Sequence, residues 1–214
     1  IDYNAESLYE TIPNFHNTKE RYKSFINAIE RNKANRLDNV INEVNFIIER
    51  KSDTSILVDL LQKGKLPLRV THNDTKISNI LMDAKTKEGI CVIDLDTIMP
   101  GLSLYDFGDA IRSGATHVSE DEKDLNKVFI DLEFFEAFTK GFLEGTANSL
   151  TEKEIELLPM AVKIITLEQG IRFLTDYLNG DVYYKTNYND QNLDRTRTQL
   201  KLVKDIEEKL NEMK

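Results

Sequence analysis

The chain has 214 residues, of which 40% are hydrophobic and 30% are charged, a balance typical of a globular domain and not of a disordered segment. With 28 Lys and Arg against 37 Asp and Glu, the formal net charge is −9, which disfavours binding to a nucleic-acid backbone or to an anionic membrane surface. The single cysteine excludes an intramolecular disulfide and a Cys-rich zinc site.

The sequence shows no segment that would direct the chain to a membrane or out of the cell. It has no run of eighteen apolar residues, so we expect no transmembrane helix. Its first residues lack the basic and apolar pattern of a secretory signal peptide. These features predict a cytoplasmic protein. Because the first residue is Ile1 and not Met, we also expect the chain to be a piece of a longer protein.

The N-terminal third has the apolar spacing of amphipathic helices. The pattern predicts one helix from Thr18, its N-cap, to about Asn32, a second from Ala34 to Arg50, and a short third that is capped by Asp53 or Thr54 and runs through Leu61. Three helices are therefore expected before the period of the sequence changes.

The middle of the chain has the composition of short β-strands. Residues 68–71 predict one strand, and residues 79–83 and 89–94 flank a polar turn and predict a hairpin. Cys91 lies in the apolar second strand of this hairpin and is expected to be a buried small hydrophobe.

Helical spacing returns from Ser119 onward. The acidic run Glu120–Glu122 is expected to be a solvated helix start, and the last amphipathic helix is expected over about Asn192 to Met213. The predicted fold is a single domain over residues 1–214, mainly α with a small β-hairpin insert, which places it in the α+β class.

The residues with the clearest chemical meaning lie between Thr71 and Arg112. His72 and Asp74 follow a predicted strand directly, Asn79 opens the next strand, and Asp94 ends an apolar one. A carboxylate at the end of a buried strand is costly unless it binds something positive. A divalent cation is the simplest partner.

The spacing of these residues suits phosphoryl transfer. An Asp and an Asn five residues apart on one loop can point into a single site, which a second Asp faces from across the hairpin. One Asp can accept a hydroxyl proton, while the Asn and the other Asp hold Mg²⁺ on nucleotide phosphates. Phosphoryl transfer needs mainly positioning and charge neutralisation, and this arrangement supplies both.

At these residues the sequence resembles a known family. The pattern His72-x-Asp74-x-x-x-x-Asn79 resembles the catalytic loop of the protein-kinase-like fold. Its context is similar to the branch that contains aminoglycoside phosphotransferases and choline kinases, in which the metal aspartate follows an apolar strand without Phe-Gly, as Asp94 does here. The runs 72–76, 93–101, 105–112 and 172–185 are similar to the bacterial N-acetylhexosamine 1-kinases. The resemblance covers the chain from about Thr11 to its end.

The resemblance implies the C-terminal lobe of such a kinase. No Gly-rich loop and no strand-borne lysine precede Asp74, so we expect the N-terminal nucleotide lobe to be absent from this chain and the isolated fragment to be inactive. For the parent protein the resemblance implies ATP as co-substrate, Mg²⁺ as cofactor, and a small-molecule sugar as acceptor. The implied reaction is phosphorylation of the anomeric hydroxyl of an N-acetylhexosamine.

Roles for the loop residues follow from this resemblance. Asp74 is expected to be the base or orienting carboxylate, and Asn79 and Asp94 are expected to be the Mg²⁺ ligands. Lys76 either steadies the transferring phosphate or is an ordinary solvent-facing lysine. His72 is expected to hold the loop by hydrogen bonds.

Two later residues are candidates for the sugar site. Arg172 and Tyr183 can hydrogen-bond sugar hydroxyls or an acetamido carbonyl, although Arg172 could instead form a salt bridge to Glu168 one helical turn earlier. Asp106 and Asp109 are expected only to cap the start of a helix beside the site.

Other functions stay open at this point. Another small-molecule kinase of the same fold would act on an aminoglycoside, choline or a different sugar. A non-catalytic helical binding module would show no activity that depends on Asp74. The hydrolase patterns G-x-S-x-G and H-E-x-x-H do not occur in the sequence.

Overall fold

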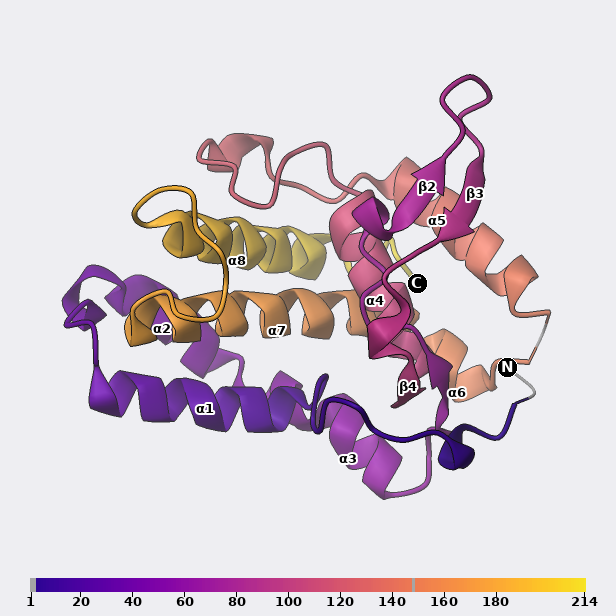
Figure 1. Ribbon diagram of the computed structural model, residues 1–214, viewed down its shortest axis with the longest axis horizontal. Helices are drawn as coiled ribbons and strands as arrows, with labels where there is room; N and C mark the ends of the chain where they lie inside the picture. The colour runs from indigo at the N-terminus through magenta and orange to yellow at the C-terminus, as the bar shows by residue number, and fades with distance from the viewer. Residues whose placement is uncertain (1–2, 148) are drawn as a thin grey trace.

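The computed structural model describes residues 3–147 and 149–214, and helices make up most of it (Figure 1). The α-helices are α1 (Thr18–Arg31), α2 (Ile41–Glu49), α3 (Ile56–Gln62), α4 (Ser103–Gly114), α5 (Leu132–Gly145), α6 (Glu152–Glu156), α7 (Leu158–Asn179) and α8 (Gln191–Lys209). The strands are β1 (Arg69–Thr71), β2 (Ile80–Met82), β3 (Gly89–Val92) and β4 (Met99–Gly101). The prediction of a mainly helical chain with a small antiparallel hairpin is confirmed.

Helix α7 is the centre of the fold. It lies between α1 and α8, and α4 crosses its N-terminal half (Figure 1). This 22-residue helix is buried along nearly its whole length because three other helices cover it. Gly108 on α4 allows the close crossing, since a Cβ there would lie 2.8 Å from the backbone oxygen of Ala161 on α7. The crossing fixes α4, and with it the residues that α4 presents to the site.

Apolar side chains form two core clusters around α7. One packs α4 and α5 against the N-terminal half of α7, with the ring of Phe107 fully buried at its centre. The other packs α1 and α2 against the C-terminal half of α7 and the start of α8, around Phe25 and Leu174. Apolar residues at helical spacing therefore bury one face of each outer helix.

The four strands form two separate antiparallel pairs. β2 and β3 form the predicted hairpin, which projects away from the helices (Figure 1). β1 pairs with β4, with Thr71 opposite Met99. The sequence did not predict β4, because its Met-Pro-Gly composition is unusual for a strand.

Some expected boundaries are wrong. Asn17, and not Thr18, caps α1, because its side chain accepts the N–H of Glu20. Where one helix was expected over residues 34–50, a 3₁₀ turn spans 37–39 and the α-helix begins only at Ile41. The third helix begins at Ile56, after a 3₁₀ turn that includes both expected capping residues.

The prediction of a helix that begins at Ser119 is also wrong. Residues 119–131 form a loop with one short 3₁₀ turn at 125–127. Glu120 does not begin a helix but pairs with Arg112 at 2.8 Å. The next helix begins at Leu132, where Asp131 caps it by accepting the N–H groups of Glu133 and Phe134.

Cys91 is exposed, and the expectation that it is buried is wrong. All four residues of β3 are exposed because the hairpin packs on no helix. The last helix begins at Gln191 and ends at Lys209, earlier than expected. None of the described helices combines the length and the apolar character needed to cross a bilayer.

Candidate active site

The loop that follows β1 is held by a carboxylate on α4. Asp106 accepts the backbone N–H groups of His72 at 2.9 Å and of Asn73 at 2.7 Å. Burial raises the pKa of Asp106, although its two backbone bonds favour the charged form. Asp106 is therefore not a helix cap, as the sequence suggested, but the residue that fixes the backbone immediately before Asp74.

Asn73 gives the loop its sharp bend. Its φ of 66° is in the left-handed region, which Asn adopts more readily than most residues. Its buried amide donates to the carbonyl of Thr97 at 3.0 Å and accepts the hydroxyl of Thr71 at 3.0 Å. Because of this bend, the next residue, Asp74, does not continue in the direction of strand β1.

A buried ion pair supports the same bend from the other side. His16 Nε2 donates to the carbonyl of Asn73 at 2.8 Å, and His16 Nδ1 lies 2.7 Å from Glu168 Oε1 on α7. Because both partners are acceptors, the ring must donate from both nitrogens and is an imidazolium. Thr18 also donates to Glu168.

Burial and charge act in opposite directions on this pair. Burial alone would lower the pKa of His16, but the negative charge of Glu168 and the two hydrogen bonds outweigh it and raise that pKa. Burial would raise the pKa of Glu168, but the charge of His16 and its hydrogen bond lower it. Both shifts favour the charged pair.

Asp74, Lys76 and Asn79 meet at one point. Lys76 Nζ lies 2.6 Å from Asp74 Oδ2, and Asn79 Nδ2 donates to Asp74 Oδ2 at 3.0 Å and to its backbone oxygen at 2.8 Å. The Asp74 side chain is 26% exposed and that of Lys76 is 40% exposed. Lys76 is thus paired with Asp74 while its amine still reaches solvent.

His72 connects this loop to the segment that leads to Asp94. Its Nδ1 accepts the backbone N–H of Asp74 at 3.2 Å, so Nε2 donates to the carbonyl of Ile93 at 3.0 Å. Asn79 accepts the N–H of the same Ile93 at 2.9 Å through its backbone oxygen. Asp94 therefore follows a residue that is bound to both ends of the loop.

Asp94 is exposed and has a left-handed backbone, with a φ of 65°. The strand before it is exposed, so the expectation of a carboxylate at the end of a buried strand is wrong. Within the described residues, neither the Asp94 carboxylate nor Asn79 Oδ1 accepts a hydrogen bond, whereas Asn79 Nδ2 is taken by Asp74.

This donor set fits Mg²⁺. One amide oxygen and one carboxylate are the hard oxygen ligands that Mg²⁺ takes from proteins, with water and phosphate completing its shell. The described residues contain no group of three or more His, Cys, Asp or Glu side chains that could hold a metal alone. A magnesium ion at Asn79 and Asp94 would therefore need phosphate or water oxygens as well.

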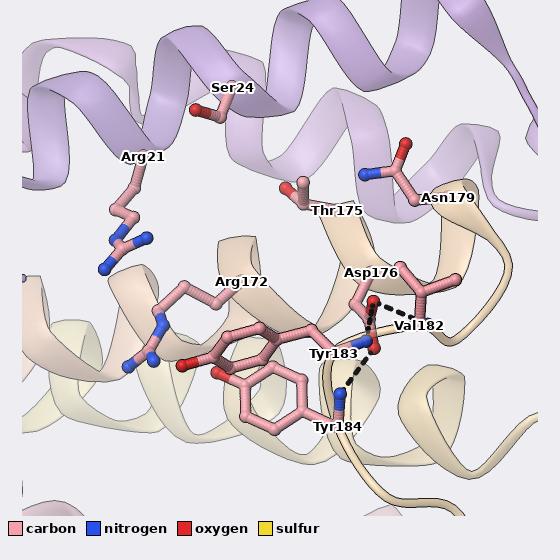
Figure 2. Close-up of a pocket in the computed structure, with 9 residues that line it drawn as sticks. All are labelled: Arg21, Ser24, Arg172, Thr175, Asp176, Asn179, Val182, Tyr183 and Tyr184. Carbon is pink, nitrogen blue, oxygen red and sulfur yellow. Dashed lines mark hydrogen bonds between the residues drawn. The ribbon is translucent and has the colours of Figure 1, made fainter.

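Arg172 and Tyr183 line one pocket of about 200 Å³ between α1, α7 and the loop that follows α7 (Figure 2). Its walls are formed by Arg21, Ser24, Arg172, Thr175, Asp176, Asn179, Val182, Tyr183 and Tyr184. Asp176 shapes the loop by accepting the backbone N–H groups of Val182, Tyr183 and Tyr184 at 2.9–3.0 Å.

The salt bridge considered for Arg172 is not formed. Arg172 donates to Gln169 at 3.0 Å, and its guanidinium lies over the Phe15 ring at 5.3 Å. Glu168 is occupied by His16 instead. Because the ring of Phe15 faces Arg172 and the next residue, His16, bonds the loop that follows β1, this short segment joins the pocket to Asn73.

Sequence reasoning missed the roles of three residues that organise the site. His16 and Glu168 belong to no motif and meet only in the fold. Asp106 carried a weak signal, because an acid between Tyr105 and Phe107 on a buried helix needs a partner. Asp109 is likewise not a cap, since it pairs with Arg112 at 2.7 Å.

A comparison with known families matches this region. The sequence profile of the phosphotransferase enzyme family (APH) matches residues 11–138, more than half of the chain. The matched range contains the loop with Asp74, Lys76 and Asn79, as well as His16 and Asp106. Arg172 and Tyr183 lie outside it.

Proposed function

Because the chain belongs to the phosphotransferase enzyme family, we propose that its parent protein transfers a phosphoryl group from ATP to a hydroxyl of a small molecule. The observation that carries the proposal is the meeting of Asp74, Lys76 and Asn79 on one loop, next to Asp94. The chain resembles the C-terminal lobe of a kinase of this family, and we propose that it carries the catalytic loop and the acceptor site.

Asp74 is the proposed catalytic base. Its Oδ2 is held by Lys76 and Asn79, while Oδ1 accepts no hydrogen bond from the described residues. The free oxygen can orient the acceptor hydroxyl and take its proton as the new O–P bond forms. Asp106 and His16 act through the backbone, because they fix the residues that set the direction of Asp74.

Lys76, Asn79 and Asp94 are the proposed phosphate and metal residues. Mg²⁺ held by Asn79 and Asp94 would supply charge neutralisation on the nucleotide phosphates. Lys76 is within reach of the same face and can pass from Asp74 to the transferring phosphoryl group, where its charge stabilises the negative oxygens. His72 holds the loop in place and has no part in the chemistry.

The proposed acceptor is an N-acetylhexosamine phosphorylated at its anomeric hydroxyl. Arg172 and Tyr183 in the pocket can donate hydrogen bonds to ring hydroxyls or to the acetamido carbonyl. Aminoglycosides and choline are cations, and the two guanidinium groups of Arg21 and Arg172 in this pocket disfavour them. A non-catalytic binding module gives no reason for the contacts of Asp74.

Steady-state kinetics on the full-length protein test the acceptor. Arg172→Ala should lower kcat/KM for N-acetylglucosamine by about ten- to a hundredfold, since a charged donor typically contributes about 1.5–3 kcal/mol, while the KM for ATP stays unchanged. Choline and an aminoglycoside should be poor acceptors for the wild type. Equal use of choline, or unchanged sugar kinetics in the variant, would contradict the acceptor assignment.

A further inference from the structure

The pocket that contains Arg172 holds a second arginine. Arg21 comes from α1 and Arg172 from α7, and Figure 2 shows both guanidinium groups at the same end of the pocket. Arg21 was not singled out by the sequence, because it is one of many charged residues on an amphipathic helix. Two like charges thus face one small cavity in a chain whose net charge is −9.

Neither guanidinium is neutralised by a carboxylate. Arg21 donates from Nε and Nη2 to the carbonyl of Phe15 at 3.2 and 2.8 Å, and Arg172 donates from Nη1 to the amide oxygen of Gln169 at 3.0 Å. No ion pair of either arginine is formed within residues 3–147 and 149–214. These three bonds use only part of the donors of each guanidinium, which has five N–H groups, and Tyr183 beside Arg172 favours its charged form.

Two acids on α7, the helix that carries Arg172, are already engaged. Glu168 is buried and bonds His16 and Thr18. Asp176 lines the pocket, but its carboxylate accepts three backbone N–H groups and the amide of Asn192. Burial and then the charge of Arg172 lower the pKa of Arg21, so the charged form of Arg21 is less favourable in this pocket than in water.

We propose that Arg21 and Arg172 bind an acidic group of the acceptor. The inference rests on the proposed function, because it names the chemical class of the molecule that the same pocket takes: an N-acetylhexosamine that carries a carboxylate or a phosphate. The N–H donors of two guanidinium groups match the paired oxygens of a carboxylate or a phosphate. A neutral sugar would leave their mutual repulsion uncompensated.

Wild-type kinetics give the first test. N-acetylmuramate adds a lactyl ether with one carboxylate to N-acetylglucosamine, and N-acetylglucosamine 6-phosphate adds one phosphate, so the two sugars distinguish the two acidic groups. At least one of them should have a KM about tenfold or more below that of N-acetylglucosamine, and this advantage should shrink as NaCl is raised. A neutral sugar that equals or exceeds both acidic sugars would overturn the proposal.

Arg21→Gln gives the second test, with Lys23→Gln as its control. Lys23 is on the same helix and loses the same charge, but it is exposed and pairs with Glu20 outside the pocket. Arg21→Gln should lower kcat/KM for the acidic sugar by about ten- to a hundredfold, a clearly larger loss than for the neutral sugar, and should leave the KM for ATP unchanged, whereas Lys23→Gln should leave both sugars within about threefold. Equal losses for both sugars, or the same effect from Lys23→Gln, would refute the assignment.

Calorimetric binding of the three sugars without ATP separates this proposal from the proposed function. If no sugar is phosphorylated but the acidic sugar binds more tightly than the neutral one, the kinase assignment fails and the assignment of an acidic ligand stands. If N-acetylglucosamine is phosphorylated but the acidic sugars bind no better, only the assignment of an acidic ligand fails. Wild-type binding and its salt dependence decide the question even if Arg21→Gln does not fold.

Discussion

Removal of the His16 side chain should destabilise the protein strongly. His16→Ala leaves the buried carboxylate of Glu168 with Thr18 as its remaining side-chain donor and leaves the carbonyl of Asn73 without the bond from His16. Loss of one partner of a buried ion pair typically costs about 3–5 kcal/mol. Total stabilities are about 5–15 kcal/mol, so the loss is a large share, and it corresponds to a fall in Tm of roughly 6–20 °C for a chain of this size.

His117→Ala is the matched control. His117 also pairs with a carboxylate, Asp131, at 2.7 Å, but its side chain is 47% exposed, so its removal should cost less than about 1 kcal/mol. Chemical denaturation of the three proteins measures both effects. Similar losses for the two variants would refute the account of His16.

The pH dependence of stability gives an independent check on the same pair. The folded-state pKa of His16 is raised above its ordinary value of 6.5. Its stabilisation is therefore fully present below pH 6.5 and is lost as pH rises through the raised pKa. The wild type should lose stability over this range, and His16→Ala should lack that loss. A parallel pH profile for wild type and variant would contradict the charged pair.

Three further predictions concern other parts of the site and fold. Asp106→Asn, which weakens the bonds to His72 and Asn73, should lower kcat at least about tenfold with little change in the KM for ATP, and unchanged kinetics would refute its positioning role. Gly101→Ala would place a Cβ against Thr71 Oγ1 and 2.8 Å from Asn73 Oδ1, so it should lower the free energy of unfolding by about 1–3 kcal/mol in denaturant unfolding. Gly141→Ala on α5, where the new Cβ meets open space, should be neutral or stabilising. Burial would raise the pKa of Glu154, but its hydrogen bonds to Arg69 and Ser103 lower that pKa to about 2. The stabilisation from ionised Glu154 is therefore present above pH 4.5 and is lost as pH falls toward 2. Glu154→Gln should flatten that part of an acid-unfolding curve, and an unchanged curve would contradict the pairing of Glu154 with Arg69.

The sequence predicted the parts of the fold that depend on local pattern. The apolar spacing of α8 and the polar turn between β2 and β3 are properties of neighbouring residues, and these elements are present. The boundaries that failed depend on tertiary contacts. Glu120 would start a helix if it were solvated, but Arg112 on α4 binds it instead.

The same distinction between local pattern and tertiary contact applies to the residues of the candidate site. Asp74, Lys76 and Asn79 are close in sequence, so a single loop brings them together, as their spacing indicated. His16 and Glu168 are 152 positions apart, and only the packing of α7 against the start of α1 joins them. No local pattern could reveal this contact. Asp106 was placed beside the site but given the wrong partner, because the N–H groups that donate to its carboxylate belong to the loop after β1 and not to its own helix.

Transfer of the γ-phosphate of ATP by the full-length protein and by Asp74→Asn tests the central claim most directly. With an N-acetylhexosamine as acceptor and ³¹P NMR as the assay, the wild type should produce ADP and a sugar 1-phosphate. Asp74→Asn keeps the size of the side chain and one acceptor oxygen but removes its basicity, so turnover should fall by about a hundredfold or more while the protein stays folded. A folded Asp74→Asn variant that turns over within about threefold of the wild type would contradict the assignment of Asp74 as the catalytic base.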